Sequence, residues 1–228
     1  MPVWQQQGES AALDSRLRPV PPVPRAEPKR RRRSRDEAEH EILEAAAALL
    51  RERPLQEVTV SAIMDQTTLS RKSFYVYFRD RYDLLTRLFR PLRRELDEVN
   101  ALFLTRPAGD VSSPAVFEAV TSFMAGPSGT LVRALHEASS YDEEARRVWR
   151  DFNEPVIAAF ADRIRRELAA GTPHDGIDVE PTVRALVGMN LYCFFDQVVG
   201  NPAADVEKIA ATLHTVWTRT FLLSDPPA

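Results

Sequence analysis

Residues 59–78 read TVSAIMDQTTLSRKSFYVYF, the pattern of a short helix, a tight turn and a second short helix. Thr59 and Ser70 each precede a helical run, where a side-chain oxygen can accept a hydrogen bond from the first helical turn. Four apolar side chains are spaced to lock the two helices together: Val60, Ile63, Leu69 and Phe74. Their burial leaves polar side chains on the outer face of the second helix, and the major groove of DNA admits such a helix. The stretch therefore predicts a DNA-binding helix-turn-helix.

Helical patterns flank this stretch on both sides. Residues 36–52 have apolar side chains at helical spacing and acidic residues in the first turns, where the helix dipole favours negative charge. Asp80 with Asp83 resembles a capping box at the start of a later helix with a leucine-rich face. Pro91 would either kink that helix or mark a boundary between domains. We therefore expect a head of three helices, followed by a fourth that leads out of it.

The remainder of the chain also reads as helical. Glycine and proline residues punctuate it, Pro155 should bend one long helix, and no stretch shows the sustained alternation of a strand. The expected helices lie near residues 92–104, 113–125, 128–139, 142–170, 179–199 and 203–223. The predicted fold class is therefore all-α.

The N-terminal residues differ in composition from the rest. Prolines crowd residues 19–28, favour extended backbone and cannot build a packed core, so this part is expected to be disordered. A basic run follows, formed by Lys29, Arg30, Arg31, Arg32 and Arg33. Beside a helix-turn-helix, such a run is expected to bind DNA phosphates or enter the minor groove. The alternatives are a solvated charge run or a nuclear import signal.

Charge and composition limit the class of protein. The net charge is −3, yet residues 25–94 carry an excess of six positive charges and residues 95–228 an excess of nine negative charges. A basic front on an acidic body predicts that one end faces a polyanion, here double-stranded DNA.

The one cysteine, Cys193, allows no disulfide within the chain, which fits a reducing cytoplasm. No apolar run suits a membrane helix or a signal peptide, so we expect a cytoplasmic protein.

The head resembles the TetR family of bacterial transcriptional regulators. The resemblance rests on four segments in order: ILEAAAALL (42–50), TVSAI (59–63), LSRKSFYVYF (69–78) and DRYDLL (80–85). After the disordered, Pro-rich and basic arm that composition predicts over residues 1–34, it implies a helix-turn-helix domain over 35–90 and a helical ligand-binding and dimerisation domain over 91–228. Thr68 stands where the family usually has a turn glycine, so we expect a strained or differently shaped turn. Arg81 replaces the usual lysine at the start of the fourth helix.

The resemblance implies roles in DNA binding residue by residue. The candidates for phosphate contact are Thr59, Ser70, Tyr75 and Arg81. The candidates for contact with base edges are Arg71, Lys72 and Ser73. Tyr77 would contact the DNA backbone or a thymine methyl group. The alternative for Tyr75 and Tyr77 is packing against the first helix of the head.

The second half is similar to one branch of the family, the mycobacterial repressors of an ethionamide-activating monooxygenase. The similarity rests on RVWRDF (147–152), MN followed by FF (189–195), and HTVW (214–217). That branch has an apolar tunnel lined by aromatic side chains. The resemblance implies lining roles for Trp149, Asn190, Phe195 and Trp217. Helical periodicity adds Phe123, Phe152 and Phe194.

Within this expected pocket, Asn190 is the best polar anchor, because a buried amide needs hydrogen-bond partners. Val156 and Val187 stand where the branch has aromatic or amide lining residues, so we expect a different ligand. A mostly apolar pocket with a few placed polar groups is typical of ligand sites. The alternative is that these aromatic side chains form the ordinary core of a helix bundle.

The last two expected helices, 179–199 and 203–223, are the expected homodimer interface, as in the family. Their apolar side chains outnumber what one buried face requires: Val183, Leu186, Val187, Leu191, Val198, Val199, Ile209, Leu213 and Val216. Two such helices from each subunit would form a four-helix interface. The alternative is burial inside one subunit.

Together with these patterns, the family resemblance implies a sequence-specific transcriptional repressor, a homodimer that leaves a palindromic operator when a small apolar ligand binds. We expect no enzyme, no cofactor and no metal site, because the common catalytic and phosphate-binding motifs are absent and the four histidines are far apart. No membrane partner is expected. The alternative is a DNA-binding protein controlled by a protein partner, or with an architectural role, that takes no small ligand.

Overall fold

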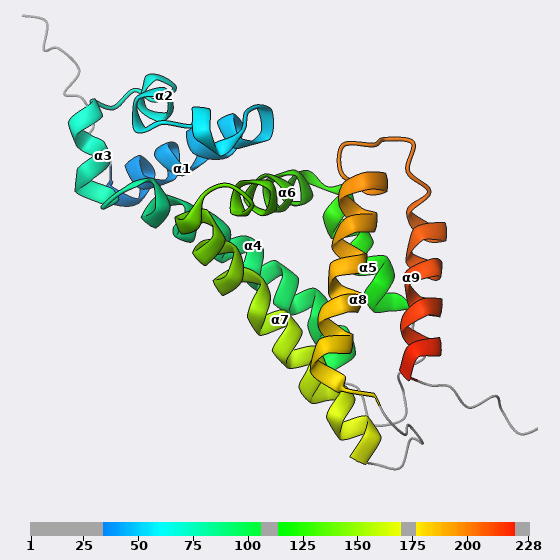
Figure 1. The fold of residues 1–228 in the computed structure, drawn as a ribbon. Helices are drawn as coiled ribbons and strands as arrows, with labels where there is room; N and C mark the ends of the chain where they lie inside the picture. Colours follow the sequence, from blue (N-terminus) through cyan, green and yellow to red (C-terminus); the bar gives the residue numbers. More distant parts are fainter. Residues whose placement is uncertain (1–33, 106–113, 170–176, 222–228) are drawn as a thin grey trace, which may run out of the picture. The chain divides into compact units, whose positions relative to one another are not determined.

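The computed structural model describes residues 34–105, 114–169 and 177–221. Within these ranges the chain is helical and contains no strand, which confirms the predicted all-α class (Figure 1). The elements are α1 (Arg35–Glu52), the 3-10 helix η1 (Leu55–Glu57), α2 (Val60–Asp65), α3 (Arg71–Tyr77), α4 (Arg81–Leu104), α5 (Ala115–Ala125), α6 (Pro127–Ser139), α7 (Glu143–Ala169), α8 (Val179–Cys193), the π-helix η2 (Phe194–Val198) and α9 (Val206–Phe221). The predicted basic arm, Lys29 to Arg33, lies outside the described residues.

Local capping explains where the helices of the head begin. Ser34 precedes α1 in a capping box: its hydroxyl accepts from the Glu37 backbone N–H, and the Glu37 carboxylate accepts from the Ser34 N–H. The Thr59 hydroxyl accepts from the Ala62 N–H at 3.1 Å, so Thr59 caps α2 as predicted. Ser70 occupies the cap position of α3, but its side chain makes no capping bond.

A small apolar core holds α1, α2 and α3 together. Ile42, Ile63, Phe74, Phe78 and Leu84 are at most 1% exposed. The predicted inward positions of the helix-turn-helix are therefore buried at Ile63 and Phe74. The other two, Val60 and Leu69, are half-buried and pack against the same core. Burying large apolar side chains stabilises the head, since each contributes roughly 1.5–3 kcal/mol.

The turn between α2 and α3 is fixed from outside by a residue of α1. Thr68, which stands where a glycine was expected, donates to Glu41 Oε1 twice, from its backbone N at 2.7 Å and from Oγ1 at 2.9 Å. A glycine has no hydroxyl and would make only the first of these bonds. Thr68 thus gives the turn an additional connection to α1.

Helix α4 runs without a break from the head into the rest of the fold (Figure 1). Asp80 Oδ1 caps its start by accepting from the backbone N–H groups of Tyr82 and Asp83. Pro91 neither ends this helix nor separates two helices, contrary to the prediction of a separate helix over 92–104. Pro91 lies on an exposed side of α4, where water can hydrate the carbonyl group that its missing N–H leaves free.

The other helices form the body around α4. Helix α4 packs against α5 and α7, α7 against α6 and α8, and α5 against α9. Helix α7 likewise continues through Pro155. The α5–α6 corner is so close that a Cβ on Gly129 would lie 1.9 Å from the Met124 carbonyl oxygen. Helix α8 changes to a π-helical turn at Phe194, and Gly200, with φ 76°, follows it in the left-handed region that favours glycine.

We predict that Glu41→Ala lowers the free energy of unfolding by about 1 kcal/mol, because two hydrogen bonds to Thr68 are removed at a mostly exposed site. Urea unfolding followed by circular dichroism measures this. The matched control is Glu44→Ala on the exposed face of the same helix, which should change the value by less than about 0.5 kcal/mol. Equal effects of the two substitutions would contradict the assigned role of Glu41.

Candidate DNA-binding surface and ligand cavity

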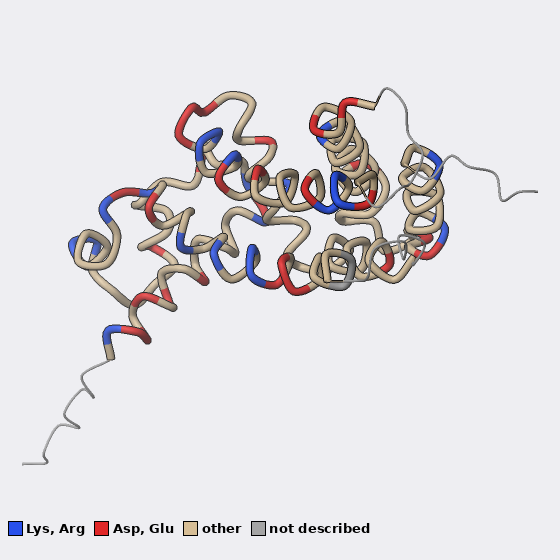
Figure 2. The backbone as a smooth tube through the Cα atoms, turned by 90° about the horizontal axis from the view of Figure 1, so that it is seen from below, with Lys and Arg blue, Asp and Glu red and all other residues tan. Residues whose placement is uncertain are grey.

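The outer face of α3 is basic at its N-terminal end. Arg71 and Lys72 are both exposed, and α3 contains no acidic residue. Figure 2 shows this helix with its basic positions at the edge of the fold, away from α5, α8 and α9. Two cations on the first turn of a short exposed helix can approach a phosphate backbone or base edges.

The hydroxyl and aromatic candidates of the head have different surroundings. Ser70 Oγ lies 2.9 Å from Ser73 Oγ, with Ser70 exposed and Ser73 half-buried. Tyr75 is 66% exposed, although its ring meets the buried Phe74 ring edge-on. Tyr77 is half-buried and packs against the core, as in the alternative considered for it. Tyr75 is therefore the more accessible of the two tyrosines.

Sequence reasoning missed Val76, which is 65% exposed on α3. A β-branched apolar side chain gains nothing from contact with water, and an exposed one between two tyrosines on this helix is a candidate for contact with a thymine methyl group. Helical spacing could have identified Val76 as exposed. Phe74 and Phe78 define the buried side of the helix, and Val76, two positions from each, falls on the opposite side.

Arg81 has protein partners in this structure. Its Nη2 donates to Asp142 Oδ2 at 3.0 Å and to the Tyr82 hydroxyl, which itself donates to the same carboxylate oxygen at 2.9 Å. The side chains of Arg81 and Asp142 are 28% and 14% exposed. Asp142 also caps α7 by accepting from the Ala145 N–H. This cluster joins the first turn of α4 to the start of α7.

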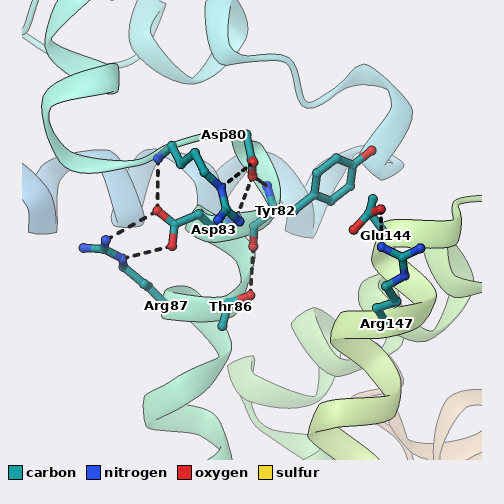
Figure 3. A network of polar contacts seen from close by, with 8 residues as sticks. Asp80, Tyr82, Asp83, Thr86, Arg87, Glu144 and Arg147 are labelled. Atoms are coloured by element: carbon teal, nitrogen blue, oxygen red, sulfur yellow. Dashed lines mark hydrogen bonds and ion pairs between the residues drawn. The ribbon is translucent and has the colours of Figure 1, made fainter.

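Figure 3 shows the surroundings of this junction. The Tyr82 ring extends from α4 toward the start of α7, where Glu144 pairs with Arg147. On the other side of α4, Asp83 pairs with Arg87, which also reaches Glu39 of α1 at 3.1 Å. The start of α4 is thus bonded to both α1 and α7.

The charge state of Asp142 follows from this geometry. Partial burial alone would raise its pKa, but donation from the Ala145 N–H and the Tyr82 hydroxyl, together with the Arg81 cation, holds the pKa below its ordinary value. The carboxylate is therefore charged at neutral pH and bonded to both sides of the junction.

The body contains a partly open apolar cavity of about 70 Å³. Its walls come from α4, α5, α6, α7, α8 with η2, and α9. Six of the seven predicted ligand residues line it: Phe123, Trp149, Phe152, Asn190, Phe194 and Trp217. Val156 and Val187, singled out as departures from the related branch, line it too. The seventh residue, Phe195, lies outside the lining and packs its ring 5.0 Å from that of His136.

Three asparagines add polar groups to this apolar wall. Asn190 Oδ1 accepts from Trp217 Nε1 at 3.1 Å, which fixes both side chains across α8 and α9. Asn100 of α4 and Asn153 of α7 also line the cavity, and sequence reasoning missed both. Leu92, Leu96 and Asn100 recur every four residues, so helical spacing could have placed Asn100 on the inward face of α4.

The last two helices bury most of the apolar residues that were expected at a subunit interface. Six of them are buried within this chain: Val183, Leu186, Val187, Val198, Val199 and Leu213. The alternative of interior burial is therefore correct for these side chains. The exposed residues of α8 and α9 include the small or hydroxyl-bearing Ala185, Gly188, Ala211, Thr212 and Thr215, and the aromatic Tyr192, which is 68% exposed.

Two other kinds of site are not found in the described part of the chain. No group of three or more histidine, cysteine, aspartate or glutamate residues there is placed to hold a metal ion. Nor does any helix described here combine the length and apolarity needed to cross a membrane.

A head with a helix-turn-helix and a helical body with an apolar cavity define a class of DNA-binding regulators. The family profile described as bacterial regulatory proteins, tetR family, matches residues 42–88, and that of the tetracyclin repressor-like C-terminal domain matches residues 114–216. Together they cover more than half of the chain, which belongs to the tetR family of bacterial regulatory proteins.

Individual proteins agree with this membership. The transcriptional regulator EthR of Mycobacterium tuberculosis is 26% identical over 193 residues, which cover 83% of this chain and 89% of EthR. Among solved structures, GusR of Salmonella enterica has a TM-score of 0.66 at 16% identity and covers 83% of this chain and 97% of its own. A protein from Saccharomonospora viridis in complex with choline has a TM-score of 0.63 at 16% identity, covering 83% and 100%. At these identities the solved structures show a shared fold.

We predict that Asp142→Asn lowers the free energy of unfolding at neutral pH by about 1–2 kcal/mol, because the charge is removed while the cap of α7 can persist. A group whose pKa is lower in the folded state stabilises the protein above its unfolded pKa, and the effect disappears as the pH falls through the folded pKa. The difference between wild type and variant should therefore shrink as the pH falls below 3.8, the ordinary pKa of the group.

Urea unfolding at a series of pH values measures this difference. The control is Glu143→Gln, in the exposed first turn of α7, which should change stability by less than about 0.5 kcal/mol. A difference for Asp142→Asn that stays constant across the acid range would show that its charge does not stabilise the junction.

Proposed function

We propose that this chain is a homodimeric transcriptional repressor that binds a palindromic operator through α3 and leaves it when a small, mostly apolar ligand occupies the body. The observation that carries the proposal is that one uninterrupted helix, α4, begins in the head and ends at the wall of the cavity. The sequence relation to EthR supports the regulatory role. Such a protein would act in the cytoplasm, where bacterial DNA is found.

In this proposal the head has two kinds of contact with DNA. Arg71, Lys72 and Ser73 read base edges, while Thr59, Ser70 and Tyr75 bind phosphates, and Tyr77 stays a weaker candidate because it is half-buried. Arg81 contacts a phosphate only with donors that Asp142 and Tyr82 leave free. The basic run at Lys29 to Arg33 adds sequence-independent attraction to phosphates.

The cavity volume supports a ligand that changes the conformation of the body. Ligand pockets commonly measure about 300–1,000 Å³, much more than the 70 Å³ found here. A drug-sized ligand must therefore displace lining side chains or helices. Leu96 and Asn100 place α4 among those helices, and its other end carries the contacts to α1 and α7. For the ligand to release DNA, it must bind the displaced conformation more tightly than the conformation that binds DNA.

The alternative is a DNA-binding protein that a protein partner controls. A cavity lined by six helical elements favours the small ligand, because ordinary packing leaves few voids larger than a water molecule. Thermal-shift screening with small apolar molecules separates the two, since only a ligand-binding body is stabilised by them.

We predict that Arg71→Ala and Lys72→Ala each weaken operator binding by roughly 10- to 100-fold and relax the preference at one base position, as when a hydrogen bond to a base edge is removed. Sequencing of bound genomic DNA fragments, followed by titration on the recovered operator, measures both effects. The charge-matched control is Arg150→Ala, an exposed cation of α7. Unchanged sequence preference in both variants would remove these residues from the reading surface.

We predict that replacing Lys29 to Arg33 by glutamine weakens binding to operator and random DNA alike. The slope of log affinity against log salt should flatten by about 0.9 for each phosphate that the variant no longer neutralises. Titrations at several salt concentrations give this slope. An unchanged slope would exclude the run from the DNA complex.

We place the dimer interface on the outer faces of α8 and α9. A Cβ on Gly188 meets no heavy atom within 4 Å, so a side chain fits there in the single subunit. We predict that Gly188→Glu gives a folded monomer with much weaker operator binding, because the charge blocks close approach of a second copy. Analytical ultracentrifugation and circular dichroism measure this, with Gly188→Ala as the control. A dimeric Gly188→Glu protein would place the interface elsewhere.

A further inference from the structure

The cavity contains an amide that the fold itself does not use. Asn100, on α4, is only 3% exposed and lines the cavity, yet its side chain has no hydrogen-bond partner among the described residues. By contrast, Asn190 is held by Trp217 Nε1. Buried polar groups are nearly always hydrogen-bonded, because leaving one unpaired costs free energy. The Asn100 amide faces the cavity without a bond to the described part of the chain, so a molecule in the cavity can supply its partner.

The rest of the lining shows which kind of molecule can supply that partner. Among the described residues that line the cavity there is no lysine, arginine, histidine, aspartate or glutamate. A charged group moved into such an apolar space would lose its hydration without gaining an opposite charge. The polar side-chain groups are the amides of Asn100, Asn153 and Asn190, each of which can donate or accept, and the indole N–H groups of Trp149 and Trp217, of which that of Trp217 donates to Asn190. The cavity therefore suits an uncharged molecule with its own hydrogen-bonding group.

We propose that Asn100 is a ligand-binding residue, and that the effector is an uncharged, mostly apolar molecule whose carbonyl group hydrogen-bonds the Asn100 side chain. This inference rests on the proposed function and adds the chemical class of the ligand and the group on α4 that contacts it. Because Asn100 belongs to the helix that starts in the head, its bond to the ligand acts directly on α4. An aliphatic or aromatic amide, ester or ketone has the required chemistry.

The first test is the stability of the unliganded protein. Asn100→Leu replaces the unpaired amide by a larger apolar side chain of the same branching, which the adjoining cavity can accommodate, so it should raise Tm by about 2–4 °C. Asn190→Leu is the contrasting variant, because it leaves the Trp217 N–H without its acceptor and should lower Tm. Both are measured by calorimetry at one protein concentration. A fall in Tm for Asn100→Leu would assign Asn100 a structural role and overturn the proposal.

The second test compares three probes with one alkyl chain: octanamide, octanoate and octyltrimethylammonium. Titration calorimetry of the full chain should show octanamide binding at least tenfold more tightly than either ion. Asn100→Leu should weaken octanamide binding about five- to tenfold, while Glu98→Gln, an exposed change on the same helix, should leave it unchanged. Tighter binding of either ion, or no effect of Asn100→Leu, would overturn the proposal.

Release of the operator recovered by sequencing separates this proposal from the function on which it rests. If octanoate or octyltrimethylammonium binds and releases DNA better than octanamide does, ligand control stands and the neutral-ligand inference is wrong. If no straight-chain amide of six to twelve carbons binds, the inference is wrong, and the thermal-shift screen with other apolar molecules decides whether ligand control stands. If the ligand-free protein binds no DNA, the proposed release of the operator by a ligand is wrong.

Discussion

The continuity of α4 is the constraint on which the rest of the structure depends. Pro91 removes one backbone hydrogen bond of α4 without ending the helix, so α4 continues as one rod from the head to the cavity. One end is fixed by Asp80, by the Arg87–Glu39 pair and by the Arg81–Asp142–Tyr82 cluster. The other end supplies Leu96 and Asn100 to the cavity wall. Any change in cavity size therefore displaces the helix that also positions the helix-turn-helix.

Much of the head could be predicted from sequence because its determinants are local. The caps at Thr59 and Asp80 and the inward spacing of Ile63 and Phe74 act within a few residues of one another. The Thr68–Glu41 bonds and the Arg81–Asp142 pair join residues 27 and 61 positions apart, and no periodicity encodes such pairs. For the same reason the sequence could not show that Arg81 has a protein partner.

The body shows a different limit of sequence reasoning. The family resemblance and helical periodicity together located six lining residues, but the resemblance also included Phe195, which the π-helical turn after Cys193 carries outside the cavity wall. An added residue in a turn rotates every later side chain, and hydrophobic patterns do not register it. Most of the apolar residues expected at an interface of α8 and α9 are instead buried inside the chain, while small residues such as Gly188 lie on the outer face.

The placement of the tryptophans has an optical consequence. The chain has three tryptophans, and two of them, Trp149 and Trp217, line the cavity. Indole emission depends on local polarity and on quenching by nearby groups, so an occupant that displaces water or rotates the Asn190 amide would change the intrinsic fluorescence of the protein. Tryptophan fluorescence can therefore report binding without an added label, because two of the three indoles lie where a ligand would bind.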